Sequence, residues 1–255
     1  MKQFLGSRLL RALAATDDRT LARTLEANLD GRRTALVFHR VGEARAKLGM
    51  PAAEIDRLIA LLAEIGVELT VCFDDGYRDA AEYVLSRAPR FERTEWLLFV
   101  CPLRSELRRA FPWDGDATAL ADLELIREVQ QLPNAALGNH TNLHERATLL
   151  SADAWRAEIE QSKRDFERLF GPQRHFAFPF GVPGVDFTSG HVEEVRALDD
   201  SVIWSTEPRP FHRLERRPRA VLPRFCIDGR RTWKESAVHI ALHALRARVF
   251  GQARA

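Results

Sequence analysis

The sequence contains few cysteines. It has three among 255 residues, Cys72, Cys101 and Cys226, which stand far apart and are odd in number. Secreted domains that depend on disulfides carry many paired cysteines, so this content argues against a disulfide framework and suits a reducing compartment. Each cysteine falls in an apolar stretch, and we expect small buried side chains within strands.

Long apolar runs are also missing. No segment approaches the roughly 20 apolar residues that are needed to cross a bilayer. The first residues, which include Lys2, Arg8 and Arg11, lack the uninterrupted apolar run of a secretory signal. We therefore expect a cytoplasmic protein, and attachment to the surface of the inner membrane is compatible with this expectation.

The chain has no excess of charge of one sign, with 38 basic and 36 acidic residues. This balance gives no overall field that would draw the protein onto nucleic acid, and we expect no nucleic-acid partner. A composition of 45% hydrophobic and 29% charged residues is typical of a globular protein, and the length suffices for one large α/β domain. The sequence itself indicates no oligomeric state.

Residues 1–30 have the pattern of two short helices. We interpret them as an N-terminal helical appendage, so that the main domain spans residues 31–255. One helix of this appendage has a basic face, which also permits contact with a membrane surface.

From Thr34 onward, short apolar runs alternate with longer amphipathic stretches. The runs predict strands at 35–38, 69–73, 96–100, 135–137, 175–178, 201–204 and 221–226. The stretches predict helices at 52–65, 79–87, 119–131 and 152–170, followed by a C-terminal helix at 233–250. Residues 207–223, rich in proline and arginine, predict a long loop. About seven repeats of strand and helix predict a parallel sheet that closes into a (β/α) barrel.

Polar clusters follow four of the predicted strands, at the carboxyl end of the sheet where such folds place functional residues. In FDDGY, residues 73–77, two adjacent carboxylates follow an apolar strand, and at least one of them needs a cation or a proton. A plain turn is the alternative, because Asp and Gly are common turn residues.

The second cluster is HTNLH, residues 140–144. On a helical turn, two histidines four residues apart project from one face and can bind one metal ion. A histidine pair at this spacing is, by itself, more often a pair of surface or core residues that bind no metal. Together with one carboxylate, however, the two imidazoles make a set of three metal ligands, and the second aspartate is left free to act as a base.

FDDGY, HTNLH and FAFPFG at residues 176–181 stand in the order and spacing of the three main motifs of the polysaccharide deacetylase family. The sequence resembles this family, the NodB-homology or carbohydrate esterase family 4 domain, from about Thr34 to Cys226. The resemblance implies a distorted (β/α)7 barrel, to which this chain adds N- and C-terminal helices. The FHRV segment at residues 38–41 resembles the opening strand of many bacterial members.

The resemblance also implies roles for individual residues. Asp74 would be the general base, Asp75, His140 and His144 would bind the metal, and the backbone N–H of Phe180 would stabilise an oxyanion. A backbone donor fixed between Pro179 and Gly181 needs little reorganisation as charge develops.

Two features depart from the family pattern. Many members have an arginine two residues before the proline of the third motif, where this chain has Ala177. Arg40, Arg78 or Arg224 could orient Asp74 instead, and we favour Arg224 because LPRF at residues 222–225 resembles a late strand of the same branch.

The usual histidine of a late Leu-x-His strand is also absent. In branches that open with a Phe-His strand, the resemblance suggests that the early histidine is the general acid, which here is His39. His239 and His243 are the rival candidates, but their apolar neighbours favour a packing role.

Three aromatic side chains are candidates for substrate contact: Tyr77 of FDDGY, Trp113 in the loop after the third strand, and Trp204. Flat apolar rings suit the C–H faces of a pyranose, although tryptophans are more often core residues. Of the two tryptophans, Trp113 is the better candidate.

These expectations combine into one hypothesis, a hydrolase that uses a metal-activated water to remove the N-acetyl group of an amino sugar. Zinc is the first choice for an Asp-His-His set, and cobalt, nickel or manganese would fit the same ligands. Without an export signal, we expect the substrate to be a lipid- or nucleotide-linked sugar rather than a finished glycan. The alternatives are a deformylase or amidase of small amides, and an inactive carbohydrate-binding homologue.

Overall fold

The computed structural model describes residues 13–42, 46–114, 119–212 and 220–251. The strands are β1 (Arg32–Phe38), β2 (Arg40–Val41), β3 (Gly49–Met50), β4 (Glu68–Phe73), β5 (Glu95–Val100), β6 (Ala135–Asn139), β7 (His175–Ala177), β8 (Val202–Trp204), β9 (Phe211–His212), β10 (Val221–Leu222) and β11 (Phe225–Cys226). The helices are α2 (Asp18–Leu29), α3 (Ala52–Glu64), α4 (Arg78–Arg87), α5 (Pro102–Leu107), α6 (Leu123–Gln130), α7 (Ala152–Phe170), α8 (Ser189–Leu198) and α9 (Trp233–Gly251), with 3-10 turns η1 (Ala88–Arg90) and η3 (Ala147–Leu149).

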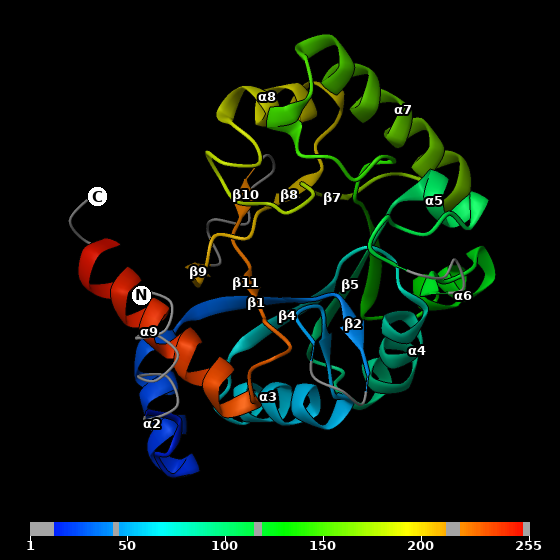
Figure 1. Ribbon diagram of the computed structural model, residues 1–255. Helices are drawn as coiled ribbons and strands as arrows, with labels where there is room; N and C mark the ends of the chain where they lie inside the picture. Colours follow the sequence, from blue (N-terminus) through cyan, green and yellow to red (C-terminus); the bar gives the residue numbers. More distant parts are fainter. Residues whose placement is uncertain (1–12, 43–45, 115–118, 213–219, 252–255) are drawn as a thin grey trace.

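The main sheet is parallel and almost closes on itself. Its strands follow the order β10-β8-β7-β6-β5-β4-β1-β11, and β9 pairs antiparallel with the start of β1. Figure 1 shows these strands as a ring with the helices around its outside. The predicted α/β fold, a distorted barrel with additional helices, is therefore confirmed.

The ring is bridged by two residues instead of a strand pair. The run at 221–226, predicted as one strand, forms β10 on one edge of the sheet, paired with β8, and β11 on the other edge, paired with β1. Pro223 and Arg224 cross between them. Proline has no N–H for a strand ladder, so the single-strand prediction is wrong at this point, and the crossing places Arg224 inside the barrel.

Alternate residues of each strand divide the core in two, because side chains along a strand point to opposite faces. On β5, Leu97 and Phe99 face the barrel interior, which they fill with Val37, Trp204 and other buried side chains. The intervening Leu98 and Val100 belong to the larger core beneath the helices. A third cluster lies under α7 and α8.

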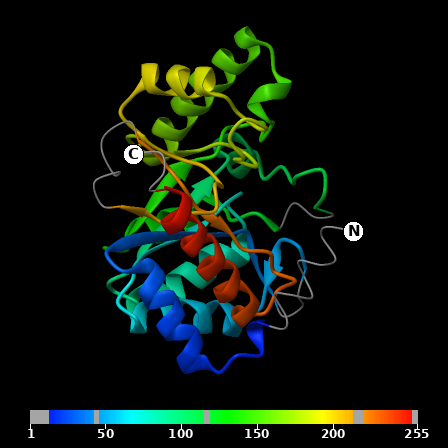
Figure 2. The same cartoon turned by 90° about the vertical axis from the view of Figure 1, so that its left-hand side faces the viewer.

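The terminal helices lie side by side outside the sheet (Figure 2). Leu21, Leu25 and Leu29 of α2 are buried in the same core as α3 and α9. The first of the two helices expected in residues 1–30 falls largely outside the described residues. No helix in the described ranges is long and apolar enough to cross a membrane.

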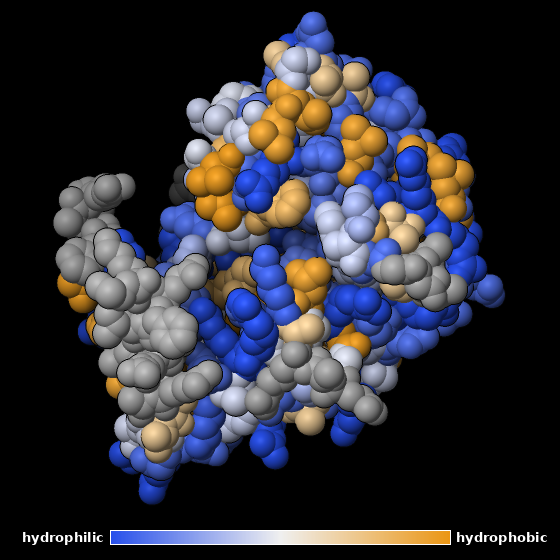
Figure 3. All heavy atoms as spheres, in the orientation of Figure 1, coloured by the Kyte–Doolittle hydropathy of each residue, from blue (hydrophilic) through white to orange (hydrophobic). Residues whose placement is uncertain are grey.

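The remaining differences from the sequence prediction are local. Helices α5 and α8 were not predicted, and the expected loop at 207–223 contains β9 and β10. Cys72 is buried in β4 as expected, whereas Cys101 is buried at the start of α5 and Cys226 is exposed on β11. On the face seen in Figure 1, apolar side chains gather over its upper part, in the region of α7 and α8 (Figure 3).

Gly138 leaves room for a ring in the barrel interior. A Cβ atom at this position of β6 would lie 2.3 Å from Cε1 of Phe99, its partner on β5. We expect Gly138→Ala to lower the free energy of unfolding by about 1–3 kcal/mol, because Phe99 must leave its rotamer. Urea unfolding measures the change. The control is Gly190→Ala in α8, where the nearest atom would be 3.6 Å away, and equal stability of the two variants would contradict the prediction.

Candidate active site

Strained backbone marks the carboxyl end of the sheet. Among the described residues, five that are not glycine have positive φ, and four of them belong to the three motifs: Asp75 (75°), Thr141 (61°), His144 (58°) and Phe180 (62°). Each left-handed residue of this kind costs of order 1–3 kcal/mol, and such strain clusters at functional sites. The strain therefore points to the same place as the motifs.

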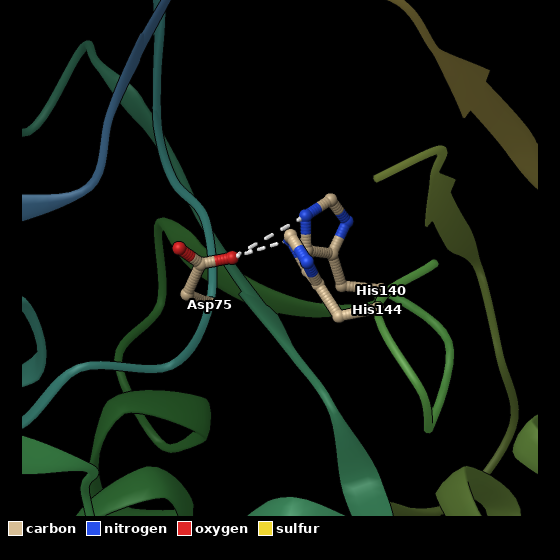
Figure 4. Close-up of side chains that lie close together, drawn as sticks. All are labelled: Asp75, His140 and His144. Atoms are coloured by element: carbon tan, nitrogen blue, oxygen red, sulfur yellow. Dashed lines mark ion pairs between the residues drawn. The ribbon is translucent and has the colours of Figure 1, made fainter. Parts of the chain in front are cut away.

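Two loops, FDDGY and HTNLH, bring the predicted metal ligands together (Figure 4). Oδ1 of Asp75 lies 2.9 Å from Nε2 of His144 and 3.6 Å from Nε2 of His140. All three side chains are buried, and one donor atom from each lies within 4.8 Å of the others. Burial alone would raise the pKa of the Asp75 carboxyl, but His144, His39 and His140 hold it well below its usual value.

The donor set fits a divalent cation. Oδ1 of Asp75 is buried and lies 2.9 Å from Nε2 of His144, but it makes no well-aligned hydrogen bond within the described part of the chain. Polar groups are seldom buried without such a bond. One carboxylate and two imidazoles are ligands that zinc and similar metals accept, and a set of three leaves coordination positions open. The structure therefore contains a candidate metal site of Asp75, His140 and His144.

His140 is oriented for ligation by a backbone group. Its Nδ1 lies 2.9 Å from the carbonyl oxygen of Ala177, so Nδ1–H donates to this oxygen and the lone pair of Nε2 faces Asp75. Burial, with contributions from His144 and Arg224, lowers the pKa of His140 to about 4. The ring is thus neutral at neutral pH, as metal ligation requires.

Arg224 holds the neighbouring carboxylate. Its Nη1 and Nη2 donate to Oδ1 and Oδ2 of Asp74 at 2.7 and 3.0 Å, and both side chains are buried. Burial would raise the pKa of Asp74, but Arg224 and, to a lesser extent, His140 keep it below its ordinary value. The carboxylate is therefore ionised at neutral pH and cannot rotate freely.

The other two arginine candidates are engaged elsewhere. Nε of Arg40 donates to Asp79 at 2.9 Å, and Nη2 of Arg78 donates to Asp122 at 2.5 Å. Neither guanidinium has a hydrogen bond to Asp74 among the described residues. Of the three arginine candidates, Arg224 is thus the one that binds Asp74 in the described part of the chain.

The HTNLH segment is a loop, so the predicted helical turn is wrong. Thr141 and His144 both adopt the left-handed region, which an α-helix does not contain. The N–H of His144 donates to Oγ1 of Thr141 at 3.1 Å, which closes a tight turn. The two imidazoles meet because this turn folds back, and their spacing in a helix plays no part.

Comparison with known proteins assigns the family. Residues 56–198 match the profile of the family described as polysaccharide deacetylase, which is more than half of the chain. The chain belongs to the polysaccharide deacetylase family. A search of the curated proteins finds no match.

Several solved deacetylases share the fold. Streptococcus pyogenes deacetylase PplD, in complex with acetate, has 14% identity and a TM-score of 0.66, with 82% of this chain and 98% of that chain covered. A polysaccharide deacetylase from Bacillus cereus has 17% identity and a TM-score of 0.63, with coverage of 82% and 69%. A de-N-acetylase from Aggregatibacter actinomycetemcomitans has 14% identity and a TM-score of 0.64, with coverage of 82% and 99%. At such identities, the likeness concerns the fold.

Within this family fold, Phe180 lies beside the candidate metal site. Its ring packs edge-on to His144 with centroids 5.1 Å apart, and it is 43% exposed. Its N–H shares a peptide plane with the carbonyl group of Pro179, whose oxygen accepts from the N–H of Gly181 at 2.7 Å, so this peptide is fixed. The N–H of Phe180 itself has no hydrogen-bond partner within the described ranges. A fixed N–H with no partner can donate to an oxygen that develops negative charge.

Trp113 is the aromatic candidate that the structure leaves accessible. It is 47% exposed, stacks on Phe111 at 4.9 Å and contacts the edge of His144 at 5.4 Å. Its Nε1 donates to the hydroxyl of Tyr77 at 3.0 Å. The indole is thereby held at the rim of the site, where a ring can stack on it.

The other two aromatic candidates are buried, and a substrate contact by their side chains is therefore excluded. Tyr77 has no exposed surface and uses its hydroxyl to accept from Trp113. Trp204 is likewise wholly buried, inside the barrel, where its Nε1 donates to Nδ1 of His175 at 3.2 Å. Both predictions fail because apolar rings at strand ends also serve to fill the core.

The candidate general acids lie in different surroundings. His39 follows β1, is half-buried, and lies close enough to Asp74 and Asp75 to lower the pKa of both. His239 and His243 lie on α9 with ring centroids 4.5 Å apart, and His243 packs against Phe225. Burial, with Arg231 and His243, lowers the pKa of His239 to about 4. These surroundings favour packing for the pair on α9.

Sequence reasoning missed the residues that support the ligand loop. Glu158, Ser162 and Asp165 are buried polar side chains on α7, on the side that carries Trp155, Ile159 and Phe166. A polar residue within an apolar helical stripe was the available signal. Glu158 and Asp165 accept hydrogen bonds from Asn142 of the HTNLH loop, and Ser162 accepts from Nδ2 of Asn139 at 3.2 Å, directly before this loop.

The Arg224–Asp74 pair makes a testable prediction. Arg224→Met leaves a buried carboxylate without a partner, and we expect the free energy of unfolding to fall by about 3–5 kcal/mol at neutral pH. The ion pair stabilises the fold above the ordinary aspartate pKa of about 3.9 and loses this effect as the pH falls through the lower pKa of folded Asp74. The difference in unfolding free energy between the wild type and Arg224→Met should therefore become smaller at acid pH. Urea unfolding at neutral and acid pH measures it.

Arg230→Met is the matched control, because Arg230 is exposed and pairs with Asp228 at the surface. This variant should lose little stability at either pH. If the two arginine variants are equally stable, the buried pair has no special part in the fold.

Proposed function

We propose that this chain is a metal-dependent hydrolase that removes the N-acetyl group of an amino sugar. The observation that carries the proposal is the convergence of Asp75, His140 and His144 beside a carboxylate that Arg224 holds ionised. Family membership supports an acetylated carbohydrate as the substrate.

Zinc is the metal that these ligands suit best, and cobalt, nickel or manganese would be accepted by the same atoms. Such a metal polarises a carbonyl group and lowers the pKa of water. Asp75 contributes the anionic ligand, and the two imidazoles contribute neutral donor atoms. The hydrogen bond from Nδ1–H of His140 to Ala177 fixes the ring so that Nε2 is presented.

Three further groups transfer protons or stabilise negative charge in the reaction. Asp74 removes the proton of the attacking water, since its Oδ2 lies 3.9 Å from Nε2 of His140 and thus next to the ligands. The N–H of Phe180 donates to the oxyanion of the tetrahedral species. His39, on the neighbouring strand end, donates a proton to the leaving amine nitrogen.

Exposed aliphatic side chains favour a substrate with a hydrocarbon part. Two loops next to His144 and Phe180 carry them, and Thr148 joins these loops by donating to the carbonyl oxygens of Val185 and, through its N–H, Asp186. The side chains are Leu143, Leu149, Val182 and Val185, which are 43–72% exposed. Branched aliphatic groups are poor platforms for a pyranose, and an exposed apolar patch is typical of a binding surface. We therefore favour a lipid-linked amino sugar over a finished polymer, with Trp113 stacking on the sugar.

Removing the base and removing a ligand should have different effects. We expect Asp74→Asn to keep the metal and to lower kcat by a factor of about 10²–10⁴, because proton transfer loses its acceptor. His140→Ala should lose or weaken the metal as well as the activity. Elemental analysis of purified protein, together with acetate release from N-acetylglucosamine compounds, measures both.

Asp153→Asn serves as the control, because its carboxylate is exposed on the first turn of α7. It should behave as the wild type in both measurements. Wild-type protein without divalent metal, or an Asp74→Asn variant of full activity, would disprove the proposed mechanism.

The substrate class can be tested with the exposed patch. We expect Val185→Asp to lower kcat/KM for a polyprenyl-phosphate-linked N-acetylated sugar at least about 10-fold more than for a water-soluble oligomer, because the new charge opposes the hydrocarbon chain. Leu245→Asp, at another exposed aliphatic side chain on α9, should leave this ratio unchanged. Equal losses on both substrates in Val185→Asp would argue for a glycan without a lipid.

A further inference from the structure

The loop that carries both histidine ligands cannot hold its own shape. Thr141 and His144 have positive φ, which costs energy for side chains with a Cβ atom. Between them, Asn142 is buried, and an unpaired N–H donor at such a residue is costly. Contacts from outside the loop must therefore compensate for both the strain and the burial.

A carboxylate on the neighbouring helix supplies the main contact. Oε1 of Glu158, on α7, accepts hydrogen bonds from the N–H of Asn142 at 2.7 Å and of Leu143 at 2.8 Å. Glu158 is only 8% exposed. Hydrogen bonds to an ionised acceptor are about twice as strong as neutral ones, and two successive N–H groups on one oxygen fix the direction of the chain between the two ligands.

The same helix secures the loop a second time. Asn142 donates from Nδ2 to Oδ2 of Asp165 at 2.8 Å, and its Oδ1 accepts from the N–H of Leu103 at the start of α5 at 2.9 Å. Asn139, just before His140, accepts from the N–H of Thr141 at 2.9 Å. These amides fix the ends and side chains of the loop, and Nη2 of Arg104 donates to the carbonyl oxygen of Leu143 at 2.9 Å. In the described part of the chain, the N–H groups of Asn142 and Leu143 are bound by Glu158 alone.

We propose that Glu158 is a positioning residue that sets the affinity of the Asp75-His140-His144 site for its metal. It contacts neither imidazole and acts through the backbone of residues 142 and 143. Without its carboxylate, the loop relaxes toward unstrained φ values and the two Nε2 atoms no longer face Asp75 together. The inference deepens the proposed function, but it requires only that the site binds a metal and not that the sugar assignment is correct.

The test measures zinc affinity without a substrate. Apo-protein competes with a chromophoric chelator for zinc at neutral pH, and urea unfolding of the same apo-protein monitors the fold. We expect Glu158→Leu to weaken zinc binding about 10–100-fold, the range for outer residues that orient metal ligands. Glu158→Gln should restore most of the affinity, because its amide oxygen can accept both hydrogen bonds.

Glu160→Leu is the matched control, since this carboxylate lies on the same helix and pairs with Arg164 at the surface, at 3.7 Å. It should bind zinc as the wild type does. Glu158→Asp covers the case in which the leucine variant does not fold, because it keeps the charge and withdraws the acceptor by one methylene. It should also bind zinc more weakly than Glu158→Gln.

Two results overturn the inference. The first is that Glu158→Leu binds zinc as tightly as Glu160→Leu does; if Glu158→Leu does not fold, the same comparison is made with Glu158→Asp. The second is that the loss of zinc affinity is no larger than the loss of unfolding free energy of the apo-protein explains, because a residue with a purely structural role would give this result. A wild type that binds zinc, responds to Glu158 as expected and hydrolyses no amino sugar would refute the proposed function and leave this inference intact.

Discussion

The site depends on the different surroundings of two adjacent buried carboxylates, Asp74 and Asp75. Asp74 and Asp75 are both almost fully buried, and two like charges in that position are unfavourable unless each has a counter-charge. Arg224 neutralises Asp74 with two hydrogen bonds, whereas Asp75 faces the two imidazoles. The position of the guanidinium thereby supports the proposed roles of Asp74 as the base and Asp75 as a ligand.

Arg224 reaches Asp74 because of the way in which the barrel closes. β10 and β11 belong to opposite edges of the sheet, and the chain passes from one to the other through Pro223 and Arg224. Its guanidinium lies 5.0 Å from the ring centroid of Phe99, and Gly138 makes room for that ring. Arg224 thus takes part both in the closure of the ring and in the neutralisation of Asp74, which links the stability of the barrel to the candidate site.

Local sequence was sufficient where a short segment determines its own structure. The apolar runs predicted the main strands, the period of α7 predicted that helix to the residue, and the polar clusters predicted the carboxyl end of the sheet. The prediction failed where distant contacts decide. Residues 221–226 resemble one strand but pair with two edges, residues 140–144 have helical spacing but are held open by α7, and Trp204 resembles a binding residue but fills the interior. No window of sequence contains those partners.

The polar residues of α7 explain two failures of the sequence prediction together: the helical turn expected at residues 140–144 and the supporting residues that it missed. A helix that faces the core is expected to be apolar along its stripe, and Glu158, Ser162 and Asp165 break this rule at buried positions. Burying a carboxylate is unfavourable unless strong donors offset the desolvation. Within the described ranges, the hydrogen-bond donors to Glu158 belong to the HTNLH loop. The loop in turn keeps two left-handed residues that its own sequence does not favour. Each irregularity is thus stable only because of the other, so the local deviation from helical patterning in α7 and the non-helical ligand loop are parts of one arrangement.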